Sequence, residues 1–454
     1  MKRLILPIIL LAGFVLRVWG IDADLPHPYY GDESYLIYHT LKFGSGDLNP
    51  HWFTWPTLFQ YSLFFLYGLY FVAGKLIGTF DSSADFLYQY LKDPTAIFLI
   101  ARAFSVLLGT VTLGALYYLG RVIYGRRVGY LAAGILAVVP LHVSYSHFAV
   151  TDGPMTFMLI TASIFIVRFF KKGTAFSYGL AGFFIGLATA TKYPAFILVV
   201  SAATAHFLRI RGERAPLFKV IFDKRVISLA IFLVLGFFIG CPFAFLDYSN
   251  FLSGMRAEYA GQRMGWFGWE EANSYVYHIT NTLRNALGAP LLIVSIAGLI
   301  RAVLRRTKEE TIFLPLVFGY YFILCRSFNT YDRFMLPLVP FLALFASKLF
   351  FEIRDRAVSG SRTAGYASYI FLIAILAVPA SRSIEADKRL TLPSTRTLAN
   401  RWVEDNIPQG SRLLINEFGP PLLESPDQIR DQFLQKADDA QLHKYYAKRG
   451  IFYR

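Results

Sequence analysis

Apolar runs of about 17–25 residues recur along most of this 454-residue chain, and they limit its possible folds more than any other feature. A helix of that length crosses the hydrocarbon layer of a bilayer. Only 17% of the residues are charged and 55% are hydrophobic, whereas about a quarter of the residues of a soluble domain are charged. The sequence therefore predicts an all-α, polytopic membrane protein.

The formal net charge of +15 raises the question of nucleic-acid binding. However, the Lys and Arg residues cluster in short loops between the apolar runs, as the positive-inside rule expects of cytoplasmic loops. We therefore predict membrane lipid as the surroundings and no nucleic-acid partner. The cysteines Cys241 and Cys325 both lie in apolar runs, so they indicate neither a disulfide framework nor a metal site.

The first apolar run follows Lys2 and Arg3 and lacks a small-residue cleavage site, so we interpret it as a retained helix rather than a signal peptide. With those cations in the cytoplasm, residues 4–21 lead outward. The run at 57–78 cannot then cross as well, because the arginine-rich loop 118–130 would fall outside. Its tyrosines and polar residues suit a helix that lies along the outer interface or re-enters from it.

The later runs alternate consistently once the run at 57–78 is kept on the outer side. The predicted spans are 97–120, 128–147, 154–170, 175–191, 194–209, 226–244, 286–303, 311–325, 334–351 and 364–380. The basic groups "RFFKKG", "RIRGERAPLFKVIFDKR", "RAVLRRTKEE" and "FEIRDRAVSGSR" then all lie inside. We predict about eleven crossings in the cell (inner) membrane, with a cytoplasmic N-terminus and an extracytoplasmic C-terminus.

Two regions follow from this topology. Residues 1–380 form the predicted membrane domain, in which residues 22–96 are the first outer loop with its interfacial helices. Residues 381–454 are polar and form a predicted small extracytoplasmic segment, with a helix at 394–406, a stop at Gly410 and a short strand in "RLLIN", hence partly α/β. No clear internal repeat supports an inverted-repeat transporter.

Ionisable residues gather where the predicted spans reach the outer side. Asp32 and Glu33 lie in the first outer loop, Arg102 near the outer start of a span, and Asp152 at the next outer turn. Ionisable groups at membrane depth are costly, so they either pair with one another or mark a functional site. Further polar residues predicted on this side are Tyr30, His51, His147, Lys192, Tyr193, Tyr331, Asp332 and Arg333.

These residues also have structural interpretations. The acidic pair could be solvated, and Asp152, which precedes Gly-Pro, could cap the next helix. Lys192 could extend to the headgroups, and Arg333 could be an interfacial anchor. Arg102 could pair with any nearby acid. "GFFIG", with Gly182 and Gly186, has the spacing of close helix packing, which is a structural role.

Acids and cations together at an outer membrane face suit sugar transfer from a lipid-linked phosphate. A carboxylate can take the proton of an acceptor hydroxyl, and Lys and Arg can stabilise the departing phosphate. A second carboxylate can stabilise the oxocarbenium-like transition state. The sequence has no Gly-rich phosphate loop, which argues against a nucleotide donor.

Two other functions stay open at this point. A transporter or lipid flippase could bind an anionic headgroup with the same residues, although charged sites near mid-membrane are then expected. A non-catalytic protein that binds a lipid-linked sugar is the third interpretation.

Several stretches carry a resemblance to a known family. They are "YYGDESYLIYHTLKF", "ARAFSVLLGTVTLGALYYLGRVIYGRRVGYLAAGILAVVPLHVSYSHFAVTDGPMTF", "GLAGFFIGLATATKYPA" and "YDRFMLPLVPFLALFA". Over roughly residues 1–350, the sequence resembles the protein O-mannosyltransferase and aminoarabinose transferase group of GT-C glycosyltransferases, of the family 39 and 83 type. The resemblance implies a GT-C bundle, a polyprenyl-phosphate sugar donor, inverting transfer and an extracytoplasmic acceptor, which could be protein, glycolipid or polysaccharide.

The resemblance also implies roles for individual residues. Asp32 would be the general base, with Glu33 beside it and Asp152 supporting the catalytic site. The donor phosphate would be bound by Lys192, Arg333, Arg102 and Tyr331, with Tyr30, His51, His147 and Tyr193 as further substrate contacts. If a divalent cation is used, Asp32 and Asp152 would be its ligands.

One stretch departs from the family pattern. Many members carry Lys-Pro-Pro or His-Pro-Pro late in the first outer loop, whereas this chain has "HWFTWPTLFQY". Trp55 stands where the basic residue would be, and Pro56 follows alone. A phosphate contact from this point would therefore need a substitute such as His51.

Overall fold

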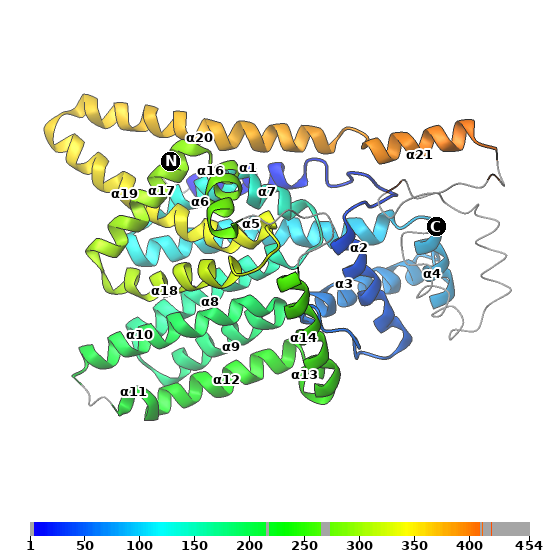
Figure 1. Ribbon diagram of the computed structural model, residues 1–454, viewed down its shortest axis with the longest axis horizontal. Coiled ribbons are helices and arrows are strands. Elements are labelled where there is room, and N and C mark those ends of the chain that lie inside the picture. Colours follow the sequence, from blue (N-terminus) through cyan, green and yellow to red (C-terminus); the bar gives the residue numbers. More distant parts are fainter. Residues whose placement is uncertain (1–3, 215–217, 265–272, 409–410, 412–418, 420–454) are drawn as a thin grey trace.

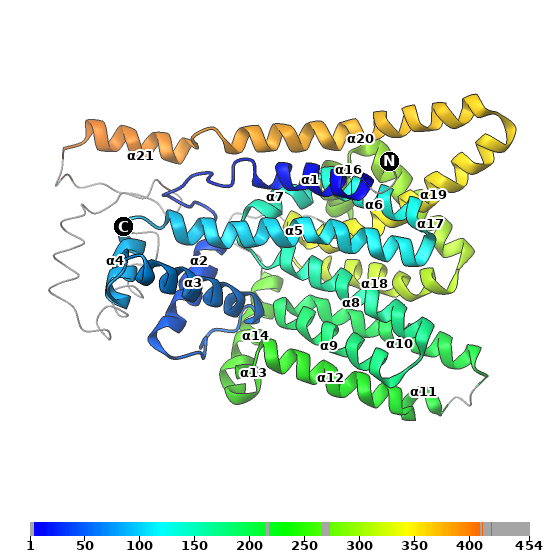
Figure 2. The ribbon, with the colours of Figure 1, turned by 180° about the vertical axis from the view of Figure 1, so that it is seen from behind.

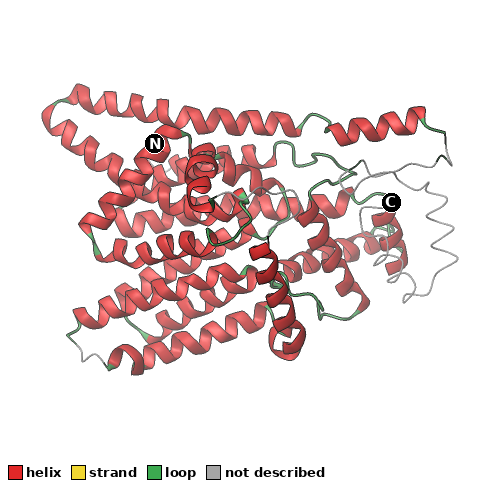
Figure 3. Cartoon of the chain, viewed as in Figure 1, coloured by secondary structure: helices red, strands yellow, loops and turns green. Residues whose placement is uncertain are grey.

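The computed structural model describes residues 4–214, 218–264, 273–408, 411 and 419. Every regular element in this part of the chain is a helix, and it contains no strand (Figure 3). The prediction of an all-α protein is confirmed to that extent. The predicted strand at 412–416 and Gly410 lie outside the described residues.

A helix occupies each predicted span. These helices are α1 (Ile5–Val18), α5 (Thr95–Tyr124), α6 (Arg126–Val138) with α7 (Pro140–His147), α8 (Asp152–Lys172), α9 (Ala175–Thr191), α10 (Leu198–Gly212), α12 (Lys224–Gly240), α17 (Ala289–Arg305), α18 (Lys308–Leu324), α19 (Val339–Gly360) and α20 (Arg362–Leu390). Among the described residues, five helices are long and apolar enough to cross a membrane, or up to seven if two bent pairs each count as one. The protein is thus a multi-pass membrane protein, and eleven crossings stays a prediction.

The remaining elements connect these helices. They are α2 (Gly31–Lys42), α3 (Leu58–Leu76), α4 (Ser83–Lys92), α11 (Lys219–Phe222), α13 (Phe243–Leu246), α14 (Tyr248–Met264), α15 (Ser274–Tyr277), α16 (Arg284–Leu287) and α21 (Thr395–Asn406), with the 3-10 helices η1 (Phe43–Ser45), η2 (Tyr193–Ile197) and η4 (Asp332–Leu338) and the π-helix η3 (His278–Leu283). Helix α21 confirms the helix predicted at 394–406.

The long helices run side by side, and their connections fall at two opposite ends of the bundle (Figures 1 and 2). One end, here the basic end, carries the arginine- and lysine-rich connections after α5, α8, α10, α17 and α19. The other end, here the site end, carries α2, α3, α4, α13, α14 and α21 (Figure 1). Thus α3 lies at the site end with α2 and α4, and it is not among the candidate spans.

Small residues bring α9 and α12 into close contact. A Cβ atom on Gly182 would lie 2.1 Å from the Leu229 carbonyl oxygen, and one on Gly186 would lie 2.2 Å from that of Leu233. Larger side chains at these glycines would force the two helices apart. The predicted packing role of "GFFIG" is confirmed.

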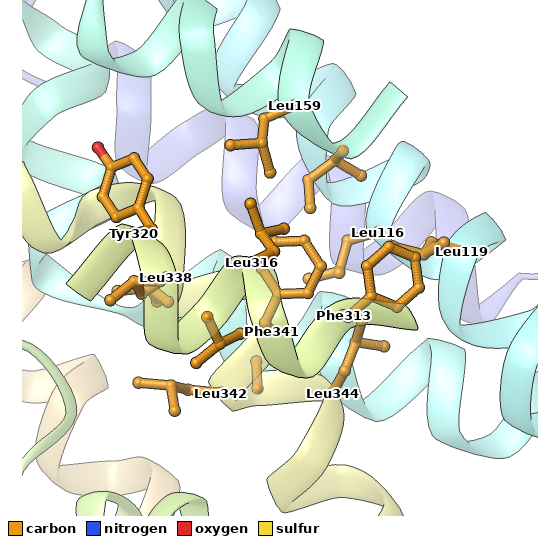
Figure 4. Close-up of a cluster of buried hydrophobic side chains, with 14 of the residues drawn as sticks. Leu116, Leu119, Leu159, Phe313, Leu316, Tyr320, Leu338, Phe341, Leu342 and Leu344 are labelled. Carbon is orange, nitrogen blue, oxygen red and sulfur yellow. The ribbon is translucent and has the colours of Figure 1, made fainter. Parts of the chain in front are cut away.

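The main apolar core fixes the helices that carry the site. Leu116 of α5 and Leu159 of α8 are fully buried together with Phe313, Leu316 and Phe341 of α18 and α19 (Figure 4). This packing holds η4, which leads into α19, against α8. The charged residues at the site end of these helices are therefore set on a rigid frame.

Candidate active site

Two neighbouring acids begin α2. The helix starts at Gly31 after Tyr30, which has extended backbone geometry, so Asp32 and Glu33 both lie in its first turn. Carboxylates are favoured there by the partial positive charge of a helix N-terminus. Successive residues of a helix face different directions, however, and the two acids have different surroundings. The Asp32 side chain is 33% exposed, whereas that of Glu33 is fully buried.

Glu33 forms a buried, two-point ion pair with Arg102 of α5. Its carboxylate oxygens accept from Nε and Nη2 of Arg102 at 2.9 and 2.7 Å, and the Ala149 amide donates to Oε1 at 2.8 Å. Nη1 of Arg102 donates to the carbonyl oxygens of Ile21 and Ala23 at 2.9 and 2.8 Å. The pair joins α2, α5 and two loops. This placement favours a positioning role for both residues over contact with substrate.

A second ion pair joins α8 to α9. The Nζ atom of Lys192, the residue after α9, lies 2.6 Å from Oδ1 of Asp152, the first residue of α8. The two side chains are 14% and 4% exposed. No side chain caps the start of α8, so the carboxylate of Asp152 is used by the ion pair and not as a helix cap.

A third ion pair joins η4 to α2. The Arg333 guanidinium pairs with the Asp32 carboxylate and donates to the Tyr30 hydroxyl at 3.1 Å. It also lies over the ring of Tyr331, 4.4 Å from the ring centre. Arg333 before α19 and Tyr30 before α2, which are 303 positions apart in the sequence, are therefore in direct contact.

Both residues of the second ion pair and Asp32 of the third line one recess of about 190 Å3 of space, open solvent included. Its lining residues are Asp32, Leu36, Trp55, Val150, Thr151, Asp152 and Lys192. Burial raises the pKa of the Tyr30 hydroxyl and Arg333 lowers it, while Asp32 and Asp152 each raise it further. Tyr30 therefore lies within the field of both ion pairs.

The loop between η1 and α3 forms one wall of the recess. Trp55 lines the recess directly. Tyr193, a predicted substrate contact, donates its hydroxyl to the Phe53 carbonyl oxygen at 2.8 Å and so anchors this loop. The departure from the family pattern thus places an indole ring, not a cation, beside Asp32.

Two predicted substrate contacts lie elsewhere. His51 is an exposed residue of that loop, with Nε2 2.7 Å from Oδ2 of Asp47. His147 is buried, with Nε2 3.0 Å from the Trp19 carbonyl oxygen. Neither side chain lines the recess, so this geometry does not favour direct substrate contact by either.

Sequence reasoning missed two buried charged residues, one on α1 and one on α20. Arg17 of α1 is fully buried and bonds to main-chain carbonyl oxygens of α6 and to His142 Nδ1 at 2.9 Å. Asp387 of α20, also fully buried, lies 3.6 Å from His147 Nε2. The signal for Arg17 was a charge inside an apolar run. The sequence around Asp387 is polar, so it does not indicate that Asp387 is buried.

The C-terminal helices also contact the loop that leads into α2. Thr397 of α21 lies 3.4 Å from both Oδ1 of Asp24 and the Tyr29 hydroxyl. The neighbouring Arg396 guanidinium lies over the Tyr29 ring, 5.3 Å from its centre. The described part of the C-terminal segment therefore helps to hold the chain just before Asp32.

The described residues do not form a ready-made binding site for a divalent cation. No three His, Cys, Asp or Glu side chains of these residues gather to hold a metal ion. Asp32 and Asp152 are each neutralised by a cationic side chain. Arg333 and Lys192 would have to leave these carboxylates before a metal could bind both.

Residues 97–240 match the model of the dolichyl-phosphate-mannose-protein mannosyltransferase family. This segment runs from α5 to the end of α12 and holds Arg102, Asp152 and Lys192. The predicted resemblance to this family is confirmed. No curated protein sequence matches the chain.

The fold is similar to solved GT-C membrane enzymes. The oligosaccharyltransferase of Archaeoglobus fulgidus in its apo form is 13% identical with a TM-score of 0.58, and its complex with an inhibitory peptide and a dolichol-phosphate is 13% identical with a TM-score of 0.56. Each match covers 89% of this chain and 58% of the archaeal chain. ArnT from Cupriavidus metallidurans bound to undecaprenyl phosphate is 12% identical with a TM-score of 0.54, over 96% of this chain and 88% of that one. The predicted GT-C-type fold is confirmed.

Proposed function

We propose that the chain is an inverting membrane glycosyltransferase, which moves a sugar from a polyprenyl phosphate to a hydroxyl group of an acceptor outside the cytoplasm. The observation that carries this proposal is that Asp32, which is paired with Arg333, lines one recess together with the Asp152–Lys192 pair. The family match and the two similar structures that contain lipid phosphates support such a donor.

Asp32 acts as the general base. Its carboxylate is partly exposed at the recess and is oriented by Arg333. The acceptor hydroxyl attacks the anomeric carbon from the face opposite the phosphate, and its proton passes to Asp32. The carbon–oxygen bond to the phosphate breaks as the new glycosidic bond forms, so the configuration inverts and the polyprenyl phosphate leaves with the bonding electrons.

Lys192 and Arg333 hold the donor phosphate. Charge-assisted hydrogen bonds to phosphate are strong, and they strengthen as negative charge builds on the leaving group. Each of these cations is paired with an acid. When the donor binds, the cation either leaves its acid for the phosphate or contacts both. Asp152 keeps Lys192 in place and adds negative charge near the oxocarbenium-like carbon.

The proposed location is the cell (inner) membrane, with the site end outside the cytoplasm and the N-terminus inside. The concentration of Arg and Lys at the opposite, basic end supports this orientation. Residues 1–380 then form the catalytic membrane domain with the first outer loop at 22–96, and the segment from 381 to 454 lies outside.

The depth of the site favours an enzyme over a transporter. Asp32 lies in the first turn of α2, Asp152 is the first residue of α8, and Lys192 follows the last residue of α9. These groups sit at helix ends, whereas a transporter is expected to bind its substrate near the middle of the bundle.

The test is Asp32→Asn in purified protein reconstituted in nanodiscs and supplied with radiolabelled polyprenyl-phosphate monosaccharides and membrane acceptor. Loss of a general base lowers kcat by roughly 10²- to 10⁴-fold. Asp47→Asn is the matched control, because Asp47 is an exposed acid of the same outer loop and its variant should keep full activity. Wild-type turnover by Asp32→Asn at normal protein levels would exclude Asp32 as the base.

A further inference from the structure

A carboxylate of α20 is buried inside the bundle, although α20 lies at the edge of the bundle (Figures 1 and 2). Large apolar side chains of this helix, such as those of Tyr366, Ile370 and Ile373, are exposed. Asp387, in contrast, is fully buried, and α20 packs beside α1 and α7. Because an acid inside a membrane bundle is costly, its presence indicates a function rather than simple packing.

Asp387 lies beside a histidine and near an arginine. Its Oδ1 atom is 3.6 Å from Nε2 of His147, the last residue of α7, and Arg17 of α1 interacts with it electrostatically. Neither carboxylate oxygen accepts a hydrogen bond from a described residue. The Arg17 guanidinium bonds instead to carbonyl oxygens of α1 and α6 and to His142. His147 is therefore the side chain that meets Asp387 at the distance of an ion pair.

His147 is also tied to the end of α1 and to its own helix. Its Nε2 atom lies 3.0 Å from the carbonyl oxygen of Trp19, which follows α1. Its Nδ1 atom lies 3.0 Å from the carbonyl oxygen of Val143, one turn earlier in α7. The negative charge of Asp387 favours the ring orientation in which Nε2 carries a proton. The imidazole thus joins the ends of α1, α7 and α20.

The residues that follow His147 carry contacts to the candidate active site, and we name residues 148–152 the site loop. The Ala149 amide donates at 2.8 Å to Glu33, the acid next to the proposed base. The last three residues of the site loop line the recess: Val150, Thr151 and Asp152. His147 therefore fixes the point from which this segment enters the site.

From these contacts we infer that His147 and Asp387 are positioning residues for sugar transfer, through which α20 holds the site loop in place. This inference rests on the proposed function. Neither side chain lines the recess, so neither takes part in a chemical step. Both act through the site loop, which carries Asp152 and bonds to the first turn of α2. Since a displacement of about 1 Å at a reacting group can slow a reaction about 100-fold, an anchor at the start of this loop affects the rate.

The stability of the bundle does not require this pair. Charged groups in a protein interior are often neutral or unfavourable for stability, and an apolar side chain at position 387 would fill the space without that cost. The Ser383 hydroxyl, one turn earlier on α20, already anchors the helix by donating to the Val138 carbonyl oxygen at 2.8 Å. What Asp387 adds to this anchor is a directed contact with His147.

The first measurement follows the site loop without any sugar transfer. Amide hydrogen exchange is measured by mass spectrometry on the purified protein in nanodiscs. In Asp387→Asn and in His147→Gln, the Ala149 amide should exchange about tenfold faster than in the wild type, because its bond to Glu33 loosens. Ser383→Ala is the matched control, since it removes a buried anchor of the same helix, and it should leave this rate unchanged. Wild-type exchange in both pair variants would overturn the inference.

The second measurement connects the site loop to the reaction. Asp387→Asn and His147→Gln should each lower kcat about tenfold in the nanodisc assay described above. The double variant should be no slower than either single variant, because both residues act through one contact. Ser383→Ala should keep the wild-type kcat.

The outcomes separate this inference from the proposed function. An unchanged kcat in folded pair variants, or losses that multiply in the double variant, would overturn the inference and leave the proposed function intact. No transfer by the wild-type protein would overturn the proposed function and the role of the pair in transfer, whereas the exchange rates would still decide whether the pair holds the site loop.

Discussion

Glu33 and Arg102 face each other side-on, with two nitrogen–oxygen distances of 2.9 and 2.7 Å, and both side chains are at most 1% exposed. The residue just before Glu33 is the proposed base. Because Asp32 and Glu33 share one turn of α2, the buried ion pair fixes the position from which Asp32 reaches the recess. The ion pair of Glu33 therefore holds the first turn of α2, and with it the proposed base Asp32, in a fixed position.

Removing one partner of this pair should destabilise the protein strongly. Arg102→Met leaves the Glu33 carboxylate buried without its cation, a change that costs about 3–5 kcal/mol. Unfolding in mixed micelles measures the effect. The matched control is Glu385→Gln, which removes an ion pair on the surface. The side chains of Arg389 and Glu385 are 75% and 62% exposed, and exposed ion pairs contribute about 0–1 kcal/mol to stability. Equal stability of the two variants would show that the Glu33–Arg102 pair has no special role.

The sequence identified the acids but could not assign their roles. Asp32 and Glu33 are adjacent and chemically alike, so composition and spacing predict the same function for both. Their difference arises from the face of α2 that packs against α5, which depends on contacts between residues about 70 positions apart. The gathering of Asp32, Asp152, Lys192 and Arg333, in contrast, was predictable from the alternation of basic loops and apolar runs.

Lys192 is predicted to govern donor affinity. Lys192→Met should raise the KM for the polyprenyl-phosphate sugar roughly 10- to 100-fold, because a hydrogen bond to a charged group contributes about 1.5–3 kcal/mol. Steady-state kinetics with varied donor provides the measurement. The variant also leaves Asp152 unpaired, so the double variant Lys192→Met/Asp152→Asn separates the two effects. An unchanged donor KM in both would rule out phosphate contact by Lys192.

Gly20 is predicted to be important for stability, because it lies against the end of α20. Its φ angle is +80°, and a Cβ atom there would lie 2.9 Å from Cβ of Leu390 at the end of α20. Gly20→Ala should therefore cost more than the roughly 1–2 kcal/mol of a left-handed backbone geometry alone. Gly46→Ala isolates that backbone cost, because Gly46 has a φ of +91° and open space around it. Thermal unfolding should rank Gly20→Ala below Gly46→Ala, and the reverse order would refute the packing argument.

The extent of α20 could not be predicted from local sequence. The apolar run ends near residue 380, where polar residues begin, and the prediction placed a boundary there. The helix continues to Leu390 because Ser383 and Asp387, one turn apart, face the bundle. The Ser383 hydroxyl donates to the Val138 carbonyl oxygen at 2.8 Å. Such a distant polar partner leaves no periodic pattern in the sequence.

His39 is predicted to make the fold sensitive to acid. Its pKa is about 3 in the folded protein, against 6.5 for the free side chain. Below pH 6.5 the unfolded chain binds a proton that the folded chain excludes, so the free energy of unfolding falls as the pH falls. At pH 5 this loss is about 2 kcal/mol. His39→Phe keeps a ring beside Trp52 and removes the titration, so its unfolding temperature should drop less between pH 7 and 5. Parallel losses in both proteins would contradict this origin.

The orientation of the protein in the membrane depends on α3. If α3 stays on the outer side, Ser83 is extracytoplasmic and Arg126 is cytoplasmic; if α3 crosses, both positions change sides. Ser83 and Arg126 are exposed, and the native Cys241 and Cys325 are buried, so single introduced cysteines can be labelled over a low background. In intact cells a membrane-impermeant maleimide should label Ser83→Cys and spare Arg126→Cys. Labelling of Arg126→Cys without Ser83→Cys would put the basic end outside and the recess in the cytoplasm, where the proposed extracytoplasmic acceptor could not reach Asp32.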